Sequence, residues 1–315
     1  MKENGVQLPS ILVERLRLSH ESILFDWSEC FMLEKVAWVT DSTGFLDDEL
    51  QKNENVYVVP IQIHMEGKNY LDGINIANED MFRAMTERGA VVTTSQPSVG
   101  QFHELYQQLE NNGYDRIYAF LLSEQLSGTV SSSKQASQLV NIPVHTFDTM
   151  LLSYPLTYIM KMAIALFEKG CSSYKLLERA ASFRDSNEAY VLIGSLEQLH
   201  KSGRLSSIKY YLGSFLKIKP IVAVVKGKLE IPDIARNEVQ AEKMIFAKLK
   251  VAVDSHDISD CMILYGRFRE QADRWIEKIG HLYPHLHIHV YPLGTALGVH
   301  VGGNTLGISW FKEKI

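Results

Sequence analysis

The sequence predicts an α/β protein made of two α/β domains, the first built around a mostly parallel sheet. From Lys35 onward, short apolar runs alternate with helical segments, a pattern typical of βαβ units and parallel sheets. The chain has 315 residues, a length that favours two domains over one. A polar run at 184–188 marks the expected boundary, so the predicted domains are 35–185 and 186–315.

The first domain is expected to alternate strands and helices along its length. The expected strands are 36–40, 56–65, 69–71, 117–122 and 144–147, and the expected helices are 78–88, 99–112, 127–139 and 150–168. The run from Ile117 to Leu122 is continuously apolar, which indicates a strand buried on both faces. Ser98 precedes the helix at 99–112 and carries the hydroxyl that an N-cap needs.

The second domain is expected to carry a hairpin and end on two strands around a glycine-rich loop. The expected strands are 190–193, 218–225, 229–235, 261–265, 288–291 and 306–311, and the expected helices are one opening at 195 and those at 239–253 and 270–279. Lys226-Gly227-Lys228 supplies the hairpin turn. Ser195 and Gln198 have the spacing of a capping box. The last two strands flank a glycine-rich loop at 294–303.

Residues 1–34 form an N-terminal extension of uncertain status. No strand pattern appears before Lys35, although Leu12, Leu16 and Ile23 can share one face of an amphipathic helix. Met32 lies directly before the first convincing strand and is an alternative start.

Cysteine use and hydropathy predict a cytoplasmic protein. The three cysteines lie far apart and form no CxxC pair, so a disulfide framework or structural zinc site is disfavoured. The first residues lack the uninterrupted apolar core of a secretory signal. The lipophilic stretch 149–167 contains Lys161, which favours a buried helix over a membrane span.

The charge distribution disfavours general nucleic-acid binding but leaves one basic stretch. The net charge is −5. Between Gln198 and Leu229 there is no Asp or Glu, and Arg204 is the most prominent of seven basic residues there. Such a stretch is either a solvated face or a docking surface for an anionic partner.

The stretch Thr93 to Ser98 is open to two interpretations. Pro97 restricts the residue before it to extended conformations, so the chain must turn here. One interpretation is a well-capped surface turn. The other is an anion site, because hydroxyls beside a helix N-terminus suit a small carboxylate.

Three hydroxyl-rich loops follow predicted parallel strands. They begin at Asp41-Ser42, at Thr93 and at Ser123, and the third leads through Ser127-Gly128 into a helix. Open α/β sheets bind ligands at the carboxyl ends of their strands. Each loop alone reads as a helix cap, whereas the three together favour a polar binding cleft.

Common catalytic and metal-binding motifs are missing or weak. The chain has no GxxxxGK[ST] loop, no GxGxxG after a strand and no GxSxG elbow. A hydrolase or acyltransferase that uses Ser127 and His300 is the alternative hypothesis. His285, His287 and His289 alternate along one expected strand, as either a metal site or a solvated face.

The ordered motifs of the chain resemble the DegV family of bacterial fatty-acid-binding proteins. The similarity runs from about Lys35 to the last residues. The motifs that carry it, in order, are Val39-Thr40-Asp41-Ser42-Thr43, Val59-Pro60, Tyr70-Leu71-Asp72-Gly73, Thr94-Ser95-Gln96-Pro97-Ser98, Leu126-Ser127-Gly128-Thr129, Lys201-Ser202-Gly203-Arg204, Leu212-Gly213-Ser214 with Ile218-Lys219-Pro220, and His300-Val301-Gly302. No single motif is diagnostic, but the ordered set is specific.

This resemblance implies two α/β domains that clasp one long-chain fatty acid in the cleft between them. It implies that Thr94, Ser127 and His300 bind the carboxylate, with no cofactor beyond the bound lipid and no metal. It further implies that a separate fatty acid kinase phosphorylates the carboxylate with ATP, and it associates Arg204 and Arg236 with that handover. The additional candidates for the pocket wall are Ser95, Gly128, Thr129, Asp41 and Ser42.

Overall fold

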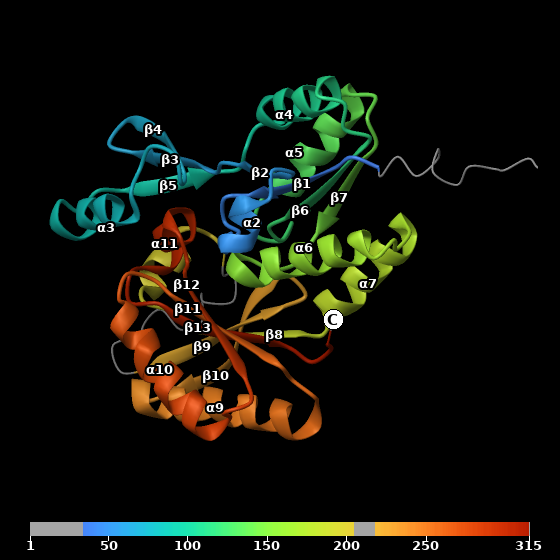
Figure 1. Ribbon diagram of the computed structural model, residues 1–315. Coiled ribbons are helices and arrows are strands. Elements are labelled where there is room, and N and C mark those ends of the chain that lie inside the picture. The colour runs from blue at the N-terminus through green and yellow to red at the C-terminus, as the bar shows by residue number, and fades with distance from the viewer. Residues whose placement is uncertain (1–33, 205–217, 315) are drawn as a thin grey trace, which may run out of the picture. The chain divides into compact units, whose positions relative to one another are not determined.

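The computed structural model describes residues 34–204 and 218–314 (Figure 1). The described residues from Lys35 onward form one compact unit, and every element below belongs to it. The expectations for residues 1–33, including Met32 as a start, fall outside the described residues. Lys209 and Lys217 of the basic stretch fall outside them as well.

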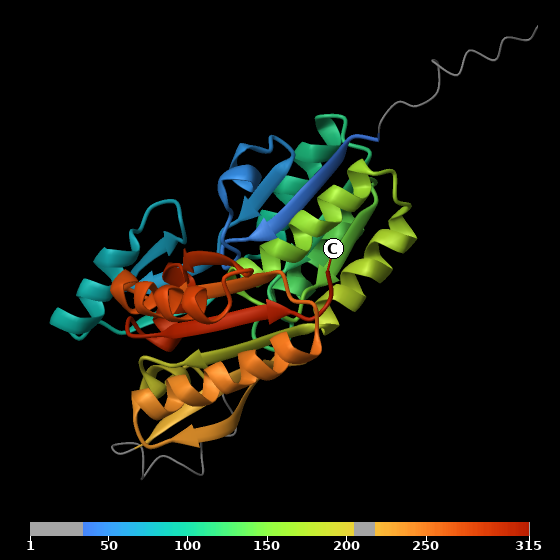
Figure 2. The same ribbon diagram turned by 60° about the horizontal axis from the view of Figure 1, so that its bottom comes forward.

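A four-stranded parallel sheet comes first in the chain, in the order β2-β1-β6-β7. Its strands are β1 (Val36–Asp41), β2 (Val56–Val59), β6 (Arg116–Leu121) and β7 (Val144–Asp148). Its helices are α2 (Asp48–Lys52), α4 (Val99–Asn111), α5 (Thr129–Ala136), α6 (Ser153–Glu168) and α7 (Ser173–Asp185), with a 3-10 turn η1 (Ser137–Leu139) after α5. Helices α4 and α5 cover one face and α6 and α7 the other, as Figure 2 shows. The parallel sheet expected from the sequence is confirmed.

A small antiparallel sheet, β4-β3-β5, follows β2. Its strands are β3 (Gln62–Met65), β4 (Lys68–Leu71) and β5 (Val92–Ser95), and its helix is α3 (Asn78–Glu87). The prediction of one strand over 56–65 is wrong, because β2 and β3 belong to different sheets. Pro60 separates them, since it lacks the N–H that a continuous central strand would need.

The remaining strands form a six-stranded mixed sheet in the order β10-β9-β8-β13-β11-β12. Its strands are β8 (Asn187–Leu192), β9 (Lys219–Val225), β10 (Lys228–Ala235), β11 (Asp260–Tyr265), β12 (His287–Pro292) and β13 (Leu306–Phe311). Its helices are α8 (Leu196–Lys201), α9 (Glu238–Ser255), α10 (Arg269–Leu282) and α11 (Thr295–Val301). Helices α9 and α10 pack on the face away from α6 (Figure 1). The predicted hairpin is confirmed as β9-β10.

The glycine-rich segment 294–303 contains a helix and is not the loop that its composition predicted. Helix α11 occupies Thr295–Val301 and contains His300. Gly302 ends it with a φ of 81° and a ψ of 161°, a backbone conformation that glycine adopts readily because it lacks a Cβ. The glycines therefore delimit the helix, and His300 is held on a regular element.

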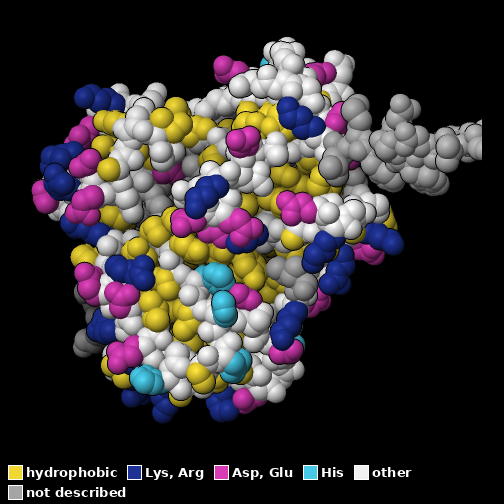
Figure 3. Space-filling model, in the orientation of Figure 1, with side chains coloured by type: hydrophobic (Ala, Val, Ile, Leu, Met, Phe, Trp, Pro, Cys, Tyr) yellow, Lys and Arg dark blue, Asp and Glu magenta, His cyan; other side chains and the backbone are white. Residues whose placement is uncertain are grey.

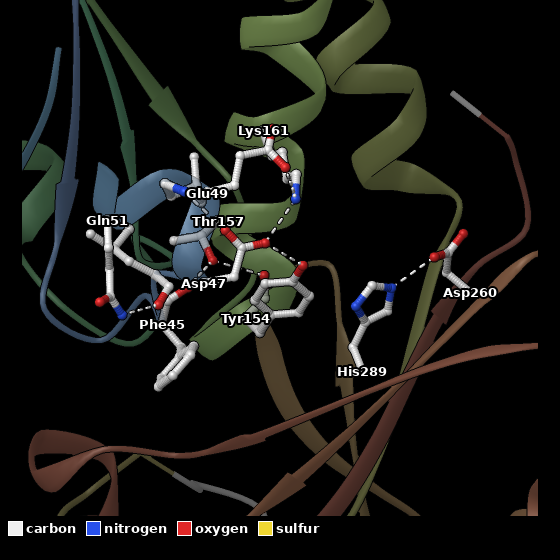
Figure 4. Close-up of polar contacts among 11 residues, drawn as sticks. Phe45, Asp47, Glu49, Gln51, Tyr154, Thr157, Lys161, Asp260 and His289 are labelled. Carbon is white, nitrogen blue, oxygen red and sulfur yellow. Dashed lines mark hydrogen bonds and ion pairs between the residues drawn. The ribbon is translucent and has the colours of Figure 1, made fainter. Parts of the chain in front are cut away.

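Helix α6 is mostly buried and is tied to α2 by a polar cluster, shown in Figure 4. Lys161 Nζ lies 2.8 Å from Asp47 Oδ2 and 2.7 Å from Glu49 Oε2. The Tyr154 hydroxyl donates to Asp47 Oδ2 at 3.0 Å. Burial alone would raise the pKa of Asp47, but its bonds to Lys161 and neighbouring groups outweigh burial and lower the pKa. None of the described helices, α6 included, has the length and apolar character that crossing a membrane requires.

Candidate functional site

A largely apolar cavity lies against the inner face of the six-stranded sheet. The cavity together with the open solvent at its mouth holds about 1090 Å³ of space that no atom fills. Its walls come from the ends of β5 and β6, the start of α6, the strands β8, β9, β11 and β13, and α11. Leu122, which lines the cavity, directly follows the parallel strand β6, so this part of the wall lies at the carboxyl edge of the parallel sheet, where ligands of open α/β sheets bind.

Thr94, Ser127 and His300 all line this cavity. Thr94, on β5, and His300, on α11, are 206 residues apart in sequence, yet Thr94 Oγ1 lies 2.7 Å from His300 Nε2. Ser127 Oγ lies 2.9 Å from Thr129 Oγ1, just before α5. The three residues predicted from the sequence are thus brought to one cavity by three separate elements.

His300 is neutral at pH 7. Burial, followed by the nearby charge of Arg204, lowers the pKa of His300 to about 4. Its Nδ1 is buried and has no hydrogen-bond partner among the described residues. Whichever ring nitrogen carries the proton, the Thr94–His300 pair keeps one unused donor, the Thr94 O–H or the His300 Nδ1–H. The pair can therefore donate one hydrogen bond to an oxygen of a ligand.

Low pH is expected to destabilise the protein through His300. Its pKa of about 4 lies below the unfolded value of about 6.5, so the unfolded chain binds the proton more readily. The stability that the neutral form contributes is complete above about pH 6.5 and is lost as the pH falls toward 4. We expect this loss to reach about 2.5 kcal/mol at pH 4.5 and to disappear in His300→Gln.

The measurement is urea unfolding of both proteins at pH 7.0 and 4.5. His281→Gln, a substitution at an exposed site on α10, is the matched control. An equal pH-dependent loss of stability in wild type and His300→Gln would contradict the assignment.

Arg204 adds a positive charge to the cavity lining. Its Nη1 donates to the carbonyl of Ser202 at 2.6 Å. Burial lowers the pKa of Arg204, but a guanidinium remains protonated in proteins. A cation, two hydroxyls and an imidazole together suit a carboxylate group.

The remaining candidates from the sequence are distributed differently. Ser95 lines the cavity, whereas Asp41, Ser42, Gly128 and Thr129 are not part of its lining. Asp41 is fully buried and accepts hydrogen bonds from the backbone of Thr43 and Leu122. Asp41 thus joins the ends of β1 and β6.

Arg236 directly follows β10 and does not line the cavity. Its backbone N–H donates to Gln240 Oε1 at 2.8 Å, at the start of α9. Arg204 and Arg236 therefore differ in position, one inside the cavity wall and one outside it.

Asp72 holds the helix that carries His300, a role that the sequence pattern did not reveal. The Ser42 hydroxyl donates to Asp72 Oδ2 at 2.8 Å, and Asp72 also accepts from the backbone of Ala296 and the side chain of Thr295 at the start of α11. Burial raises the pKa of Asp72 in spite of these bonds. In the sequence, Asp72 was noticed only as part of the motif Tyr70-Leu71-Asp72-Gly73, which carries the resemblance to the family and gives no hint of this role.

The described residues contain no cluster of His, Cys, Asp or Glu that could hold a metal ion. His289 instead pairs with Asp260, with its Nε2 2.7 Å from Asp260 Oδ1 (Figure 4).

On the face shown in Figure 3, acidic and basic side chains are interspersed, so that face carries no extended field of one sign.

Comparison with known proteins identifies the family. The family model described as "Uncharacterised protein, DegV family" matches residues 35–313. A DegV domain-containing protein of Staphylococcus aureus is 29% identical over 278 residues, covering 87% of this chain and 98% of the relative. One from Listeria innocua is 26% identical over 282 residues, covering 89% and 99%.

Two solved structures are similar throughout the same region. A DegV family protein from Thermus thermophilus, described by its fatty acid binding, has a TM-score of 0.82 and 26% identity, covering 89% of this chain and 100% of its own. DegV from Bacillus subtilis, described as a fatty acid binding protein, has a TM-score of 0.80 and 26% identity with the same coverage. Given the model match over 35–313, this chain belongs to the DegV family.

Proposed function

We propose that this protein binds one long-chain fatty acid in the cavity, with the carboxylate at Thr94, Ser127 and His300. The observation that carries the proposal is an apolar cavity with these hydrogen-bonding groups and Arg204 in its wall. The similar structures from Thermus thermophilus and Bacillus subtilis, described as fatty-acid-binding, support it.

The apolar chain supplies most of the affinity. Burying a methylene contributes about 0.8 kcal/mol, so about fifteen of them contribute roughly 12 kcal/mol before the cost of ordering the ligand. The polar groups mainly orient the carboxylate and satisfy its hydrogen bonds, because an unpaired buried charge would be costly.

We further propose that the protein is a carrier without catalytic activity of its own, working in phospholipid metabolism in the cytoplasm. It presents the carboxylate to a separate ATP-dependent fatty acid kinase, with Arg204 and Arg236 involved in the handover. The resemblance of the motifs supports this step, and the sequence lacks a P-loop that would bind ATP. Because fatty acids partition into bilayers, the proposal includes transient contact with a membrane surface.

The alternative of a hydrolase or acyltransferase using Ser127 and His300 is not supported. A serine nucleophile needs its base within hydrogen-bond reach. Here Ser127 Oγ lies against Thr129 Oγ1, and His300 Nε2 lies against Thr94 Oγ1. Among the described residues, no hydrogen bond joins Ser127 to His300.

Mass spectrometry of lipid extracted from the purified protein is the direct test of fatty acid binding. A co-purified or titratable long-chain acid is expected. Absence of both would overturn the proposal. Acyl phosphate formation from the loaded protein with ATP and a fatty acid kinase tests the carrier step separately.

Replacing Thr94 with Val is expected to weaken fatty acid binding by about 10- to 100-fold. The change keeps the shape but removes the hydroxyl, and a hydrogen bond to a charged group is worth about 1.5–3 kcal/mol. Thr93→Val is the matched control, since Thr93 is the exposed neighbour on β5 and does not line the cavity. Isothermal titration with hexadecanoic acid measures both, and equal affinities would remove Thr94 from the site.

A further inference from the structure

An amide side chain, Asn187, lies in the cavity wall at the end of β8 that is away from His300. Along β8 and the residue after it, Asn187, Ala189, Val191 and Ile193 line the cavity at every second position, as the alternation of a strand requires. Two residues after Ile193, the Ser195 N–H donates to the carbonyl of Val301 at 2.8 Å, and Val301 is the residue after His300. Thr94 and His300 therefore lie near the Ile193 end of this row, and Asn187 is at the opposite end.

Half of the Asn187 amide is unsatisfied. Its Nδ2 donates to Ser309 Oγ at 2.9 Å and to the Trp310 carbonyl at 3.0 Å. A carbonyl accepts hydrogen bonds and cannot donate them, so this contact fixes which amide atom is nitrogen. The other atom, Oδ1, is buried and has no partner among the described residues. A buried acceptor of this kind favours a ligand that donates to it.

The length of the cavity wall along β8, from Asn187 to Ile193, matches that of a common acyl chain. Six residues separate Asn187 from Ile193, which at about 3.3 Å each gives roughly 20 Å. An extended hydrocarbon chain advances about 1.25 Å per carbon, given C–C bonds of about 1.5 Å. A chain of about sixteen carbons with its carboxylate near His300 thus ends beside Asn187.

We propose that the cavity accepts fatty acids with a hydroxyl at or next to the methyl end, and that Asn187 Oδ1 accepts a hydrogen bond from it. This inference rests on the proposed fatty acid binding and names the substrate class. A second carboxylate is disfavoured at that end, because Arg204 is the only permanently charged side chain among the described lining residues and lies near His300.

The test compares three acids by titration calorimetry on the lipid-free full chain. The acids are hexadecanoic, 16-hydroxyhexadecanoic and 10-hydroxyhexadecanoic acid. The terminal hydroxyl is expected to keep the affinity of the plain acid to within about threefold. The mid-chain hydroxyl, which lies nearer to Ala189 than to Asn187 along β8, is expected to cost about tenfold or more. Equal penalties for the two hydroxy acids would overturn the inference while leaving fatty acid binding intact. No binding of any acid would overturn the proposed function itself.

Asn187→Leu provides the second measurement. It removes the acceptor while keeping a side chain of similar size. The ratio of affinities for 16-hydroxyhexadecanoic and hexadecanoic acid is expected to fall about tenfold. Asn111→Leu, the same change at an exposed site at the end of α4, is the matched control and should leave the ratio unchanged. An unchanged ratio in Asn187→Leu would contradict the role of Oδ1. If that variant fails to fold, the comparison of hydroxyl positions in the wild type decides alone.

Discussion

Replacing Ala189 with Phe is expected to abolish the preference for long acyl chains. Ala189 is a small residue in the middle of β8 and lines the cavity, with 8% of its surface exposed. It lies four residues from Ile193, roughly 13 Å along the strand, which is the reach of about ten carbons. A phenyl ring at this position would exclude the carbons beyond that point.

The expected effect of Ala189→Phe is large. Losing the burial of about six methylenes removes roughly 5 kcal/mol, or more than a thousandfold in affinity for hexadecanoic acid. Decanoic acid, which ends before the ring, should bind about as it does to the wild type. Titration with acids of eight to eighteen carbons gives the profile. Val251→Phe, an exposed site on α9, controls for the added ring. An unchanged chain-length profile would show that the acyl chain does not run along β8.

Gly266→Ala is expected to destabilise the protein by about 3 kcal/mol. A Cβ at Gly266 would lie 2.5 Å from the carbonyl oxygen of Gly303 and 2.9 Å from its carbonyl carbon. Both contacts are with backbone, which cannot rotate away, and overpacking of this kind typically costs 1–3 kcal/mol and occasionally more. The affected segment directly follows α11, so fatty acid affinity should fall together with stability.

Urea unfolding of Gly266→Ala against Gly280→Ala measures this effect. Gly280 lies within α10, and nothing stands within 4 Å of a Cβ placed there. Alanine at Gly280 is expected to be neutral or to stabilise by up to about 1 kcal/mol, because glycine is a poor helix former. Equal stability of the two variants would mean that the backbone at Gly303, which follows α11, moves away from the added methyl group without cost.

Local features of the fold were predictable from the sequence. Ser98 caps α4, as expected, and Gln101 completes a capping box there that was not predicted. Ser195 caps α8, but the capping box expected with Gln198 is only half formed, because Gln198 Oε1 has no partner among the described residues. These interactions join residues three apart, so their chemistry can be recognised in a short window. The hairpin turn between β9 and β10 was predictable for the same reason.

Features that depend on tertiary contacts were not predictable. The pattern in 56–65 looks like one strand, and only its neighbours show that β2 and β3 pair in different sheets. Glycine content suggested a loop where α11 forms, and α7 was not recognised at all. For the site, hydroxyls and histidine were identified by type and by family resemblance. The bond between Thr94 and His300 and the anchoring of α11 by Asp72 depend on long-range contacts that no local pattern encodes.

The position of β13 limits when the cavity can exist during synthesis. Strand β13 (Leu306–Phe311) lies between β8 and β11 in the sheet, although every other strand of that sheet precedes it in the chain. Until the ribosome has released this strand, β8 and β11 lack their common partner and the cavity wall is incomplete. Domains usually fold in the order of their synthesis. We therefore expect the proposed fatty acid binding to begin only after β13 has been synthesised.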